Sequence, residues 1–310
     1  MGDNQTSVTE FLLVGFPLSP RMKVLLFGLF SVFYAFTLLG NGVILGLISL
    51  DSKLHTPMYF FLSQLATVDI AYACNTVPQM LVNLLSPAQP ISFAGCLTQT
   101  FLFLTFGHTE CLLLMVMSYD RYVAICLPLQ YSTIMNWRVR VTLAVAPWTL
   151  GVLLALVDMV LLLLLPFCGP QKVNHFFCEI LAVLKLTCAD THVTKVVVLS
   201  VAALVLVGPL SAIVVSYAHI VWAVLRIQSA EGRQKAFSTC SSHLCVVGLF
   251  YGTAMIMYVG PQHGDPQEQK KYLLLFHSLF NPMLNPLIYS LRNREVKAAL
   301  RRRLGKGRPS

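Results

Sequence analysis

An acid and a base, Asp120 and Arg121, stand next to each other at the end of a long apolar run. An unpaired charge at the centre of a bilayer costs roughly 3 kcal/mol or more, so charged residues in such a run need partners. A carboxylate and a guanidinium side by side can neutralise one another. The sequence therefore predicts an ion pair at the edge of the apolar segment.

Two more carboxyl groups, Asp69 and Glu110, fall midway along other apolar runs. Both could face a shared interior that holds water, a proton or a sodium ion. Alternatively, burial alone keeps one of them protonated, because desolvation disfavours the charged form. The sequence leaves both interpretations open. Asp158, in LVDMVLLLLLPF, is interpreted as an interfacial residue without a role.

The segment NPLIY, residues 285–289, predicts a kinked helix. A proline frees a carbonyl one turn earlier, and we expect the adjacent Asn285 to satisfy it. A kinked helix can hold two arrangements, so Asn285, Pro286 and Tyr289 are candidates for a conformational switch.

Composition decides the class of protein that carries these residues. Of 310 residues, 56% are hydrophobic and 11% are charged, a balance typical of membrane proteins. Runs of about 20 mostly apolar residues, long enough to cross a bilayer as helices, recur seven times. The expected spans are 24–50, 57–85, 97–120, 141–165, 196–225, 236–260 and 272–291. The last is short and contains Pro282 and Pro286, but membrane helices tolerate proline. The predicted fold class is an all-α membrane protein, a seven-transmembrane helix bundle.

The distribution of basic residues predicts the orientation. With the N-terminus outside and the C-terminus in the cytoplasm, fifteen of the 22 lysines and arginines lie on the cytoplasmic side, as the positive-inside rule requires. We expect an extracellular N-terminus (1–23), a receptor domain (24–291) and a short basic cytoplasmic tail (292–310) that lies beside membrane lipid. Nucleic acid is not an expected partner.

Cysteines and one sequon agree with this topology. Cys168, Cys178 and Cys188 share one outer loop and Cys96 begins the third span on the same side, where disulfides persist. Four cysteines allow three pairings, and spacing does not choose among them. Asn4 begins an Asn-Gln-Thr glycosylation site in the outer segment.

Several segments together resemble a known family. SYDRYVAIC and NPLIY resemble signatures of the rhodopsin-like G-protein-coupled receptors. The segments LHTPMYFFL, MSYDRYVAICLPLQY, KAFSTCSSHL and PMLNPLIYSLRN resemble the olfactory (odorant) receptor branch, and the long cysteine loop resembles class II, tetrapod-type receptors of family 2. The resemblance runs from about residue 10 to 300.

The resemblance implies a function. Such a receptor binds small volatile odorants within the helix bundle and activates a heterotrimeric G protein through the stimulatory-type olfactory α subunit, which raises cyclic AMP. It is a multi-pass protein of the plasma membrane, in the cilia of olfactory neurons. It is not an enzyme and needs no cofactor, although a sodium ion could bind between Asp69 and Glu110.

The resemblance also assigns roles to residues. Arg121 contacts Tyr217 and Tyr289 in the active state, and Cys96 pairs with Cys178, which leaves Cys168 for Cys188. Tyr251, in FYGT, stands where most rhodopsin-like receptors have a tryptophan-proline pair, so it is the expected packing toggle. The acid that usually holds the arginine from the sixth helix is missing, so the inactive lock must differ. The expected switch residues are Asp120, Arg121, Tyr122, Tyr217, Lys235, Asn285, Pro286 and Tyr289.

Leu104, His108 and Cys111 recur at helical spacing and form one face of the third span. The resemblance places this face on the odorant cavity. Phe103 stands where receptors for amines carry an acid, which favours a mostly apolar ligand. His108 either contacts the ligand or is a satisfied core histidine near Glu110. The expected lining is Phe103, Leu104, Gly107, His108, Cys111, Val201, Ala202, Val205, Tyr251, Ala254, Met255, Tyr258 and Ser278.

Other functions are less consistent with the sequence. HFFCE, residues 175–179, has the residue types of a metal site, but a disulfide at Cys178 would remove its thiolate, so no metal is expected. There is no phosphate-binding glycine loop, HExxH motif or convincing serine nucleophile. A transporter or channel would show internal repeats and paired broken helices, and neither is found. A receptor for lipids or peptides is disfavoured by PMYFFL and KAFSTC.

Overall fold

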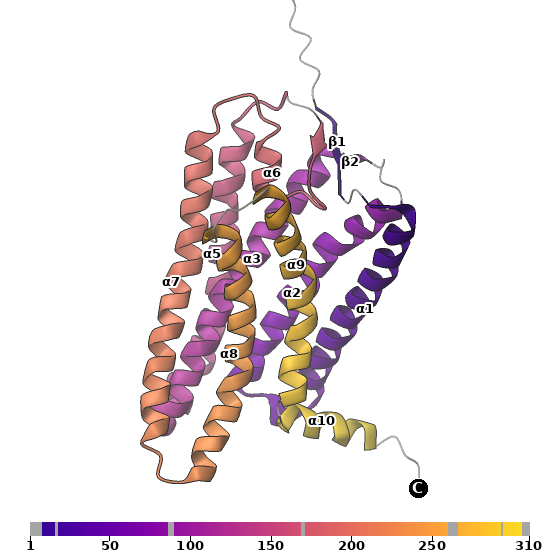
Figure 1. Ribbon diagram of the computed structural model, residues 1–310. Coiled ribbons are helices and arrows are strands. Elements are labelled where there is room, and N and C mark those ends of the chain that lie inside the picture. The colour runs from indigo at the N-terminus through magenta and orange to yellow at the C-terminus, as the bar shows by residue number, and fades with distance from the viewer. Residues whose placement is uncertain are drawn as a thin grey trace, which may run out of the picture.

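A computed structural model describes residues 8–15, 18–85, 90–168, 171–259, 266–292 and 294–305. Within these ranges, seven long helices form one bundle (Figure 1), which confirms the predicted fold class. They are α1 (Pro20–Leu50), α2 (Pro57–Leu85), α3 (Phe93–Cys126), α5 (Trp137–Leu163), α7 (His192–Leu225), α8 (Ala230–Val259) and α9 (Pro266–Arg292). Shorter helices are η1 (Ser52–Leu54), η2 (Pro128–Gln130), α4 (Tyr131–Ile134), α6 (Ile180–Leu184) and α10 (Arg294–Gly305).

Most of the helices are longer than their apolar spans. The third span was expected at 97–120, whereas α3 covers Phe93–Cys126. The extra turns are set by capping. Ser92 Oγ accepts a hydrogen bond from the Gly95 amide at 3.1 Å, and Asn136 Oδ1 accepts one from Val139 at 3.1 Å at the start of α5. These caps satisfy amides that have no partner within the helix.

Hydropathy does not mark all seven helices equally. In the described part of the chain, α1, α3, α5, α7 and α8 are long and apolar enough to cross a membrane. The other two, α2 and α9, carry polar residues that the bundle buries, among them Asp69, Asn281 and Asn285. Their polar side chains therefore face other helices and not lipid.

α3 is the central helix and contacts α2, α5, α7 and α8. α3 and α5 pack closely at Gly151. A Cβ atom at this position would lie 2.9 Å from the Thr105 carbonyl oxygen and would also collide with the Thr109 hydroxyl, which donates to that carbonyl at 2.7 Å. A glycine is therefore needed for the two helices to pack this closely.

Gly151→Ala is expected to destabilise the receptor by about 1–3 kcal/mol, because the added methyl group must push α3 and α5 apart. The melting temperature of the purified protein measures the effect. Gly208→Ala on α7 is the matched control, since a Cβ there meets no atom within 4 Å. Equal melting temperatures for the two variants would contradict the packing argument.

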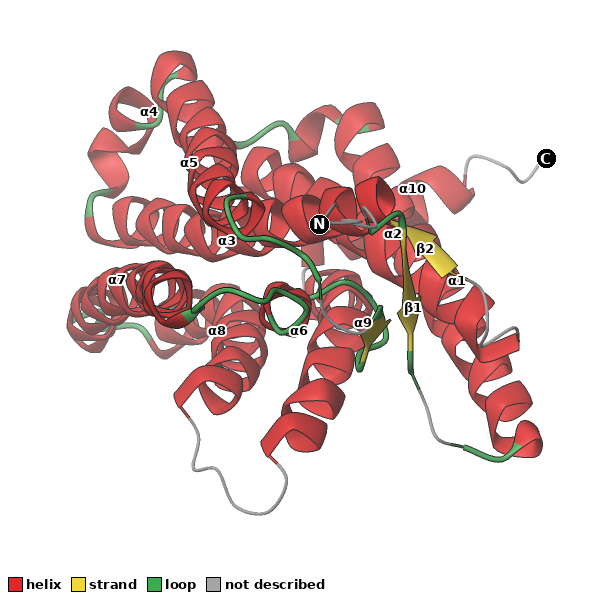
Figure 2. Ribbon diagram, turned by 90° about the horizontal axis from the view of Figure 1, so that it is seen from above, coloured by secondary structure: helices red, strands yellow, loops and turns green. Residues whose placement is uncertain are grey.

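A small sheet covers the outer end of the bundle. Strand β1 (Glu10–Leu13) pairs antiparallel with β2 (Pro90–Ser92) and parallel with β3 (Lys172–Val173). Seen from above, the sheet and α6 lie across the ends of the helices (Figure 2). No strands were expected, because the N-terminal segment is too short to fold alone. β1 forms because its pairing partners, β2 and β3, come from loops that are distant in the sequence.

The basic tail also contains structure that was not predicted. α10 leaves the foot of α9 at an angle (Figure 1) and buries Val296 and Ala299. Arg302 forms an ion pair of 2.7 Å with Asp51, and Arg303 donates to the Leu50 carbonyl. The hydrogen bonds from Arg302 hold the pKa of Asp51 below its usual value. The tail is thus held against the end of α1.

Candidate functional site

An apolar cavity lies among α3, α7, α8 and α9, with one residue from α2. The volume within which the centre of a water-sized molecule can lie is about 70 Å³. A single water needs roughly 10–15 Å³ by this measure, so the cavity is large enough for a small ligand. Eight of the expected residues line it: Phe103, Leu104, Gly107, His108, Cys111, Ala202, Val205 and Ala254. The face of α3 inferred from helical spacing thus lies on the cavity.

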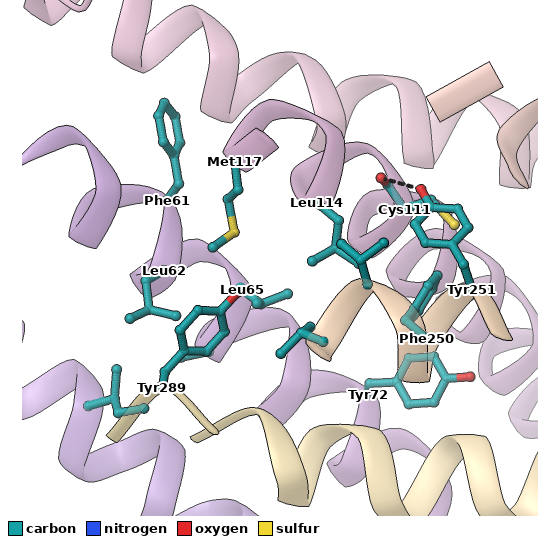
Figure 3. Close-up of a cluster of buried hydrophobic side chains, with 14 of the residues drawn as sticks. Phe61, Leu62, Leu65, Tyr72, Cys111, Leu114, Met117, Phe250, Tyr251 and Tyr289 are labelled. Atoms are coloured by element: carbon teal, nitrogen blue, oxygen red, sulfur yellow. Dashed lines mark hydrogen bonds between the residues drawn. The ribbon is translucent and has the colours of Figure 1, made fainter. Parts of the chain in front are cut away.

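The remaining expected residues lie elsewhere. Val201, Tyr251, Met255 and Ser278 are not among the lining residues, and the side chain of Tyr258 lies outside the described part. Ser278 donates to the Leu274 carbonyl of its own helix at 2.7 Å. Tyr251 donates to the Cys111 carbonyl at 2.9 Å, so it links α8 to α3 (Figure 3). The role of Tyr251 as a packing toggle stays a prediction.

Sequence reasoning missed six lining residues: Tyr72, Leu206, Phe250, Met257, Leu274 and His277. Most are apolar and carry no signal in a sequence of this composition. His277 did carry one, as a histidine within an apolar span. Its Nδ1 atom lies 2.7 Å from Thr253 Oγ1 and 3.0 Å from Asn281 Nδ2, so it joins α8 to α9.

His108 is the polar residue of the α3 wall. Its side chain is buried, and its Nδ1 atom has no hydrogen-bond partner among the described residues. The ring has a hydrogen bond to the Gly151 backbone, so in the neutral imidazole Nδ1 is the acceptor, and a ligand hydroxyl could donate to it. One ring nitrogen is thus satisfied within the protein and the other is not, so a contact between His108 and a ligand stays a prediction.

The two intramembrane carboxyls meet a shared asparagine. Asn285 Nδ2 lies 3.1 Å from both Asp69 oxygens and also approaches Glu110. Both acids are buried, and Glu110 Oε1 has no partner among the described residues. α2, α3 and α9 therefore enclose an acidic cluster of Asp69, Glu110 and Asn285.

One expectation about the α9 kink was wrong. The carbonyl freed one turn before Pro286 is that of Pro282, and Asn41 of α1 donates to it at 3.0 Å. Asn285 is occupied by Asp69 instead. α1 approaches α9 closely here, since a Cβ on Gly40 would lie 3.0 Å from Pro286 Cγ.

The cytoplasmic ion pair is present and buried. Arg121 Nη2 lies 2.7 Å from Asp120 Oδ2, and Tyr131 donates to Asp120 Oδ1 at 2.8 Å. Burial, together with the charge of Asp120, raises the pKa of Tyr131, so its phenol remains a donor. Tyr131, in the short helix α4, thus gives the Asp120 carboxylate a second hydrogen-bond partner. The sequence did not identify a substitute for the missing acid of the sixth helix, and Tyr131 is a candidate for part of that inactive lock.

The switch tyrosines do not hydrogen-bond to Arg121 in this arrangement. Tyr217 OH lies 2.8 Å from His243 Nδ1, and His243 Nε2 lies 3.1 Å from the Leu114 carbonyl. A carbonyl only accepts, so Nε2 carries the proton and Tyr217 donates to Nδ1. Tyr289 lies beside Leu62 and Leu65 (Figure 3), and its buried hydroxyl has no partner within the described chain. These contacts differ from those that the resemblance implies for the active state.

Two further switch candidates are less informative. Tyr122 stacks on Tyr119 at 6.4 Å and meets the edge of His219 at 5.8 Å. The side chain of Lys235 lies outside the described part of the structure.

The interpretation of Asp158 as interfacial is wrong. Only 1% of the residue is exposed, and its Oδ1 atom has no hydrogen-bond partner among the described residues. α5 turns this residue toward the bundle and not toward the lipid headgroups, a direction that helix spacing alone did not reveal.

Two disulfides hold the outer loop. Cys96 is bonded to Cys178 and Cys168 to Cys188, with Cα atoms 5.4 and 5.7 Å apart. These are the pairings that the resemblance implied. Asn4 lies outside the described residues.

The side chains of HFFCE are committed to structural contacts. Cys178 is in a disulfide, and Glu179 caps α6 by accepting from the Ala182 amide at 2.9 Å. Burial, with the charge of Lys271 nearby, lowers the pKa of His175 to about 3. Among the described residues, no three histidine, cysteine, aspartate or glutamate side chains gather as a metal site.

Comparisons with known proteins agree with this geometry. Residues 30–306 match the family described as olfactory receptor. The chain is 75% identical to human Olfactory receptor 2A25 over 310 residues, the full length of both, and 76% identical to Olfactory receptor 2A7 of Mus musculus over 302 residues, 97% of each. Its fold resembles squid rhodopsin, with a TM-score of 0.73 at 19% identity, over 93% of this chain and 87% of that one. The chain therefore belongs to the olfactory receptor family, in its 2A group: it is a multi-pass plasma-membrane receptor for odorants that acts through a G protein, and not an enzyme.

Proposed function

We propose that this receptor binds a small, volatile, mostly apolar odorant in the cavity beside His108 and signals through the stimulatory-type olfactory α subunit to raise cyclic AMP in olfactory cilia. The observation that supports the ligand class is the cavity itself, which is walled by apolar side chains and has one unpartnered imidazole nitrogen on α3. An apolar wall with few polar groups is typical of small-molecule sites.

The cavity sets the scale of affinity. Burial of about 200 Å² of apolar ligand surface contributes roughly 5 kcal/mol, which corresponds to a dissociation constant near 0.1–1 mM. A hydrogen bond to His108 would add about 0.5–1.5 kcal/mol. Odorants with one suitably placed polar group therefore reach the micromolar range only with good packing.

Transmission to the cytoplasm would run along α8. The cavity is bounded by Phe250, Ala254 and Met257 of α8, and the same helix contacts α3 through Tyr251 and α7 through His243. A ligand that shifts α8 would strain both hydrogen bonds. Release of Tyr217 from His243 would then allow it to approach Arg121, as the resemblance implies for the active state.

The acidic cluster is a proposed site for a sodium ion or a proton. Glu110 Oε1 is buried without a partner among the described residues, and hard oxygen ligands suit a small cation. Asp69 and Glu110 would hold the ion, and Asn285 would orient Asp69 through its two contacts of 3.1 Å.

His108→Leu is expected to weaken the response to an alcohol about tenfold and to leave the response to the hydrocarbon of the same length unchanged, because it removes one hydrogen bond. Cyclic-AMP dose-response curves, for an agonist pair found by screening small volatile compounds, measure the potency. His192→Leu, at the exposed outer end of α7, is the matched control.

Equal losses for the two ligands would mean that His108 only packs. No response to any volatile compound, from protein verified at the cell surface, would contradict the proposed ligand class.

A further inference from the structure

A second cavity lies at the outer end of the protein, bounded by β1, the first turn of α1, the end of α2 and β3. By the same measure it offers about 250 Å³, compared with about 70 Å³ for the odorant cavity. The two cavities share no lining residue.

The polar groups of this second cavity are hydrogen-bond donors. Lys23 of α1 and Lys172 of β3 contribute two cations. Asn83 Oδ1 already accepts from Gln79 at 3.1 Å, whereas its Nδ2 atom is buried without a partner among the described residues. The rest of the wall is largely apolar: Leu12, Leu13, Val14, Met80, Leu84 and Phe176. None of the described lining residues is acidic.

The walls are held in place by hydrogen bonds from several segments. The Leu12 amide donates to Gln171 at 2.7 Å and the Val14 amide to Val173 at 2.8 Å. Lys271 of α9 donates to the Gly15 carbonyl at 2.7 Å and to Asn174 at 2.9 Å, and its ammonium lies 4.9 Å from the centre of the Phe176 ring. The cavity is thus preformed, which lowers the entropic cost of binding.

We propose that this cavity binds an amphipathic anion, with a carboxylate or another anionic head at Lys23, Lys172 and Asn83 and an alkyl chain against the apolar wall. Two cations and an unpartnered amide favour an acceptor of several hydrogen bonds, and charge-assisted hydrogen bonds are the stronger ones. An alcohol of the same length supplies no charge, and a cation would be repelled. The anion is either a free carboxylate from the outer solution or an anionic lipid of the outer leaflet.

The test uses the full-length receptor in nanodiscs of neutral phosphatidylcholine and measures binding of radiolabelled octanoate and octanol. Octanoate is expected to bind saturably. The double variant Lys23→Gln, Lys172→Gln is expected to weaken this binding by about tenfold or more, with no effect on octanol. The matched control, Arg21→Gln with Lys195→Gln, also removes two positive charges from exposed outer positions but touches no lining residue, and should bind octanoate normally.

Two further arms separate the sites and the sources of the anion. Ala254→Phe fills the odorant cavity and should leave octanoate binding intact. The lipid is the anion if octanoate has no effect, nanodiscs that contain anionic phosphatidylglycerol raise the melting temperature of the receptor, and the double lysine variant removes that increase. The proposal stands in that case too. Unchanged octanoate binding in the lysine variant, loss of binding with Ala254→Phe, or no effect of either anion would overturn it.

Discussion

Arg121→Ala is expected to reduce odorant-stimulated G-protein activation by about a hundredfold, because it removes the cation that would engage the G protein, and loss of a charged contact at a protein–protein interface costs roughly 2–5 kcal/mol. In the structure Arg121 is held by Asp120 at 2.7 Å, and both side chains are almost fully buried. The substitution also leaves the Asp120 carboxylate with Tyr131 as its remaining hydrogen-bond partner among the described residues. Cyclic-AMP production at matched surface expression measures the loss.

The control for Arg121 is Arg138→Ala, which removes an exposed basic residue from the same cytoplasmic side and should retain the response. Asp120→Asn tests the lock from the other direction. It weakens the hold on Arg121 and should raise the signal without odorant. A full response from Arg121→Ala at normal surface density would show that the ion pair is only an anchor at the membrane interface.

Cys178→Ser is expected to be the most destabilising substitution outside the membrane spans. Its disulfide to Cys96 closes a separation of 82 residues, for which the chain-entropy model gives about 4–5 kcal/mol. Cys178 is also fully buried, where its amide donates to Gln99 at 2.8 Å and its carbonyl accepts from Thr100 at 3.1 Å. Loss of the bond would therefore loosen the outer loop over the end of α3. Surface expression and melting temperature are the measurements.

Two cysteine variants calibrate this result. Cys74→Ser removes a free, exposed thiol and should have little effect. Cys168→Ser breaks a bond across 20 residues and should cost less, about 3 kcal/mol in the same treatment. Wild-type expression and melting of Cys178→Ser would show that the hydrogen bonds to α3 hold the loop without the disulfide.

The cavity is lined in part by side chains that the motifs do not include. Phe250, Met257 and Leu274 line the cavity as ordinary apolar residues, and in a chain that is 56% hydrophobic such residues cannot be told apart from the rest of the core by pattern. His277 is different, because a histidine within an apolar span is costly to bury alone. The same reasoning that selected Asp69 and Glu110 would have selected it.

The sequence by itself determined the number of spans, their orientation and the placement of the ion pair. These properties follow from local physics: about 20 apolar residues cross a bilayer, basic residues remain in the cytoplasm, and a buried charge needs a partner. That Leu104, His108 and Cys111 share one face of α3 also followed from 3.6 residues per turn, whereas the resemblance placed that face on the cavity. The roles of the switch residues and the choice of disulfides came from the family resemblance.

Only the tertiary structure decided which distant group satisfies each of these residues. Asn41, and not Asn285, meets the Pro282 carbonyl; Tyr131 holds Asp120; and β1 finds its partners in two remote loops. Asp158 is buried although it lies near the end of its span. Helical periodicity shows which residues share a face, but the neighbour that the face meets depends on how the helices pack, which is a property of contacts between segments far apart in the chain.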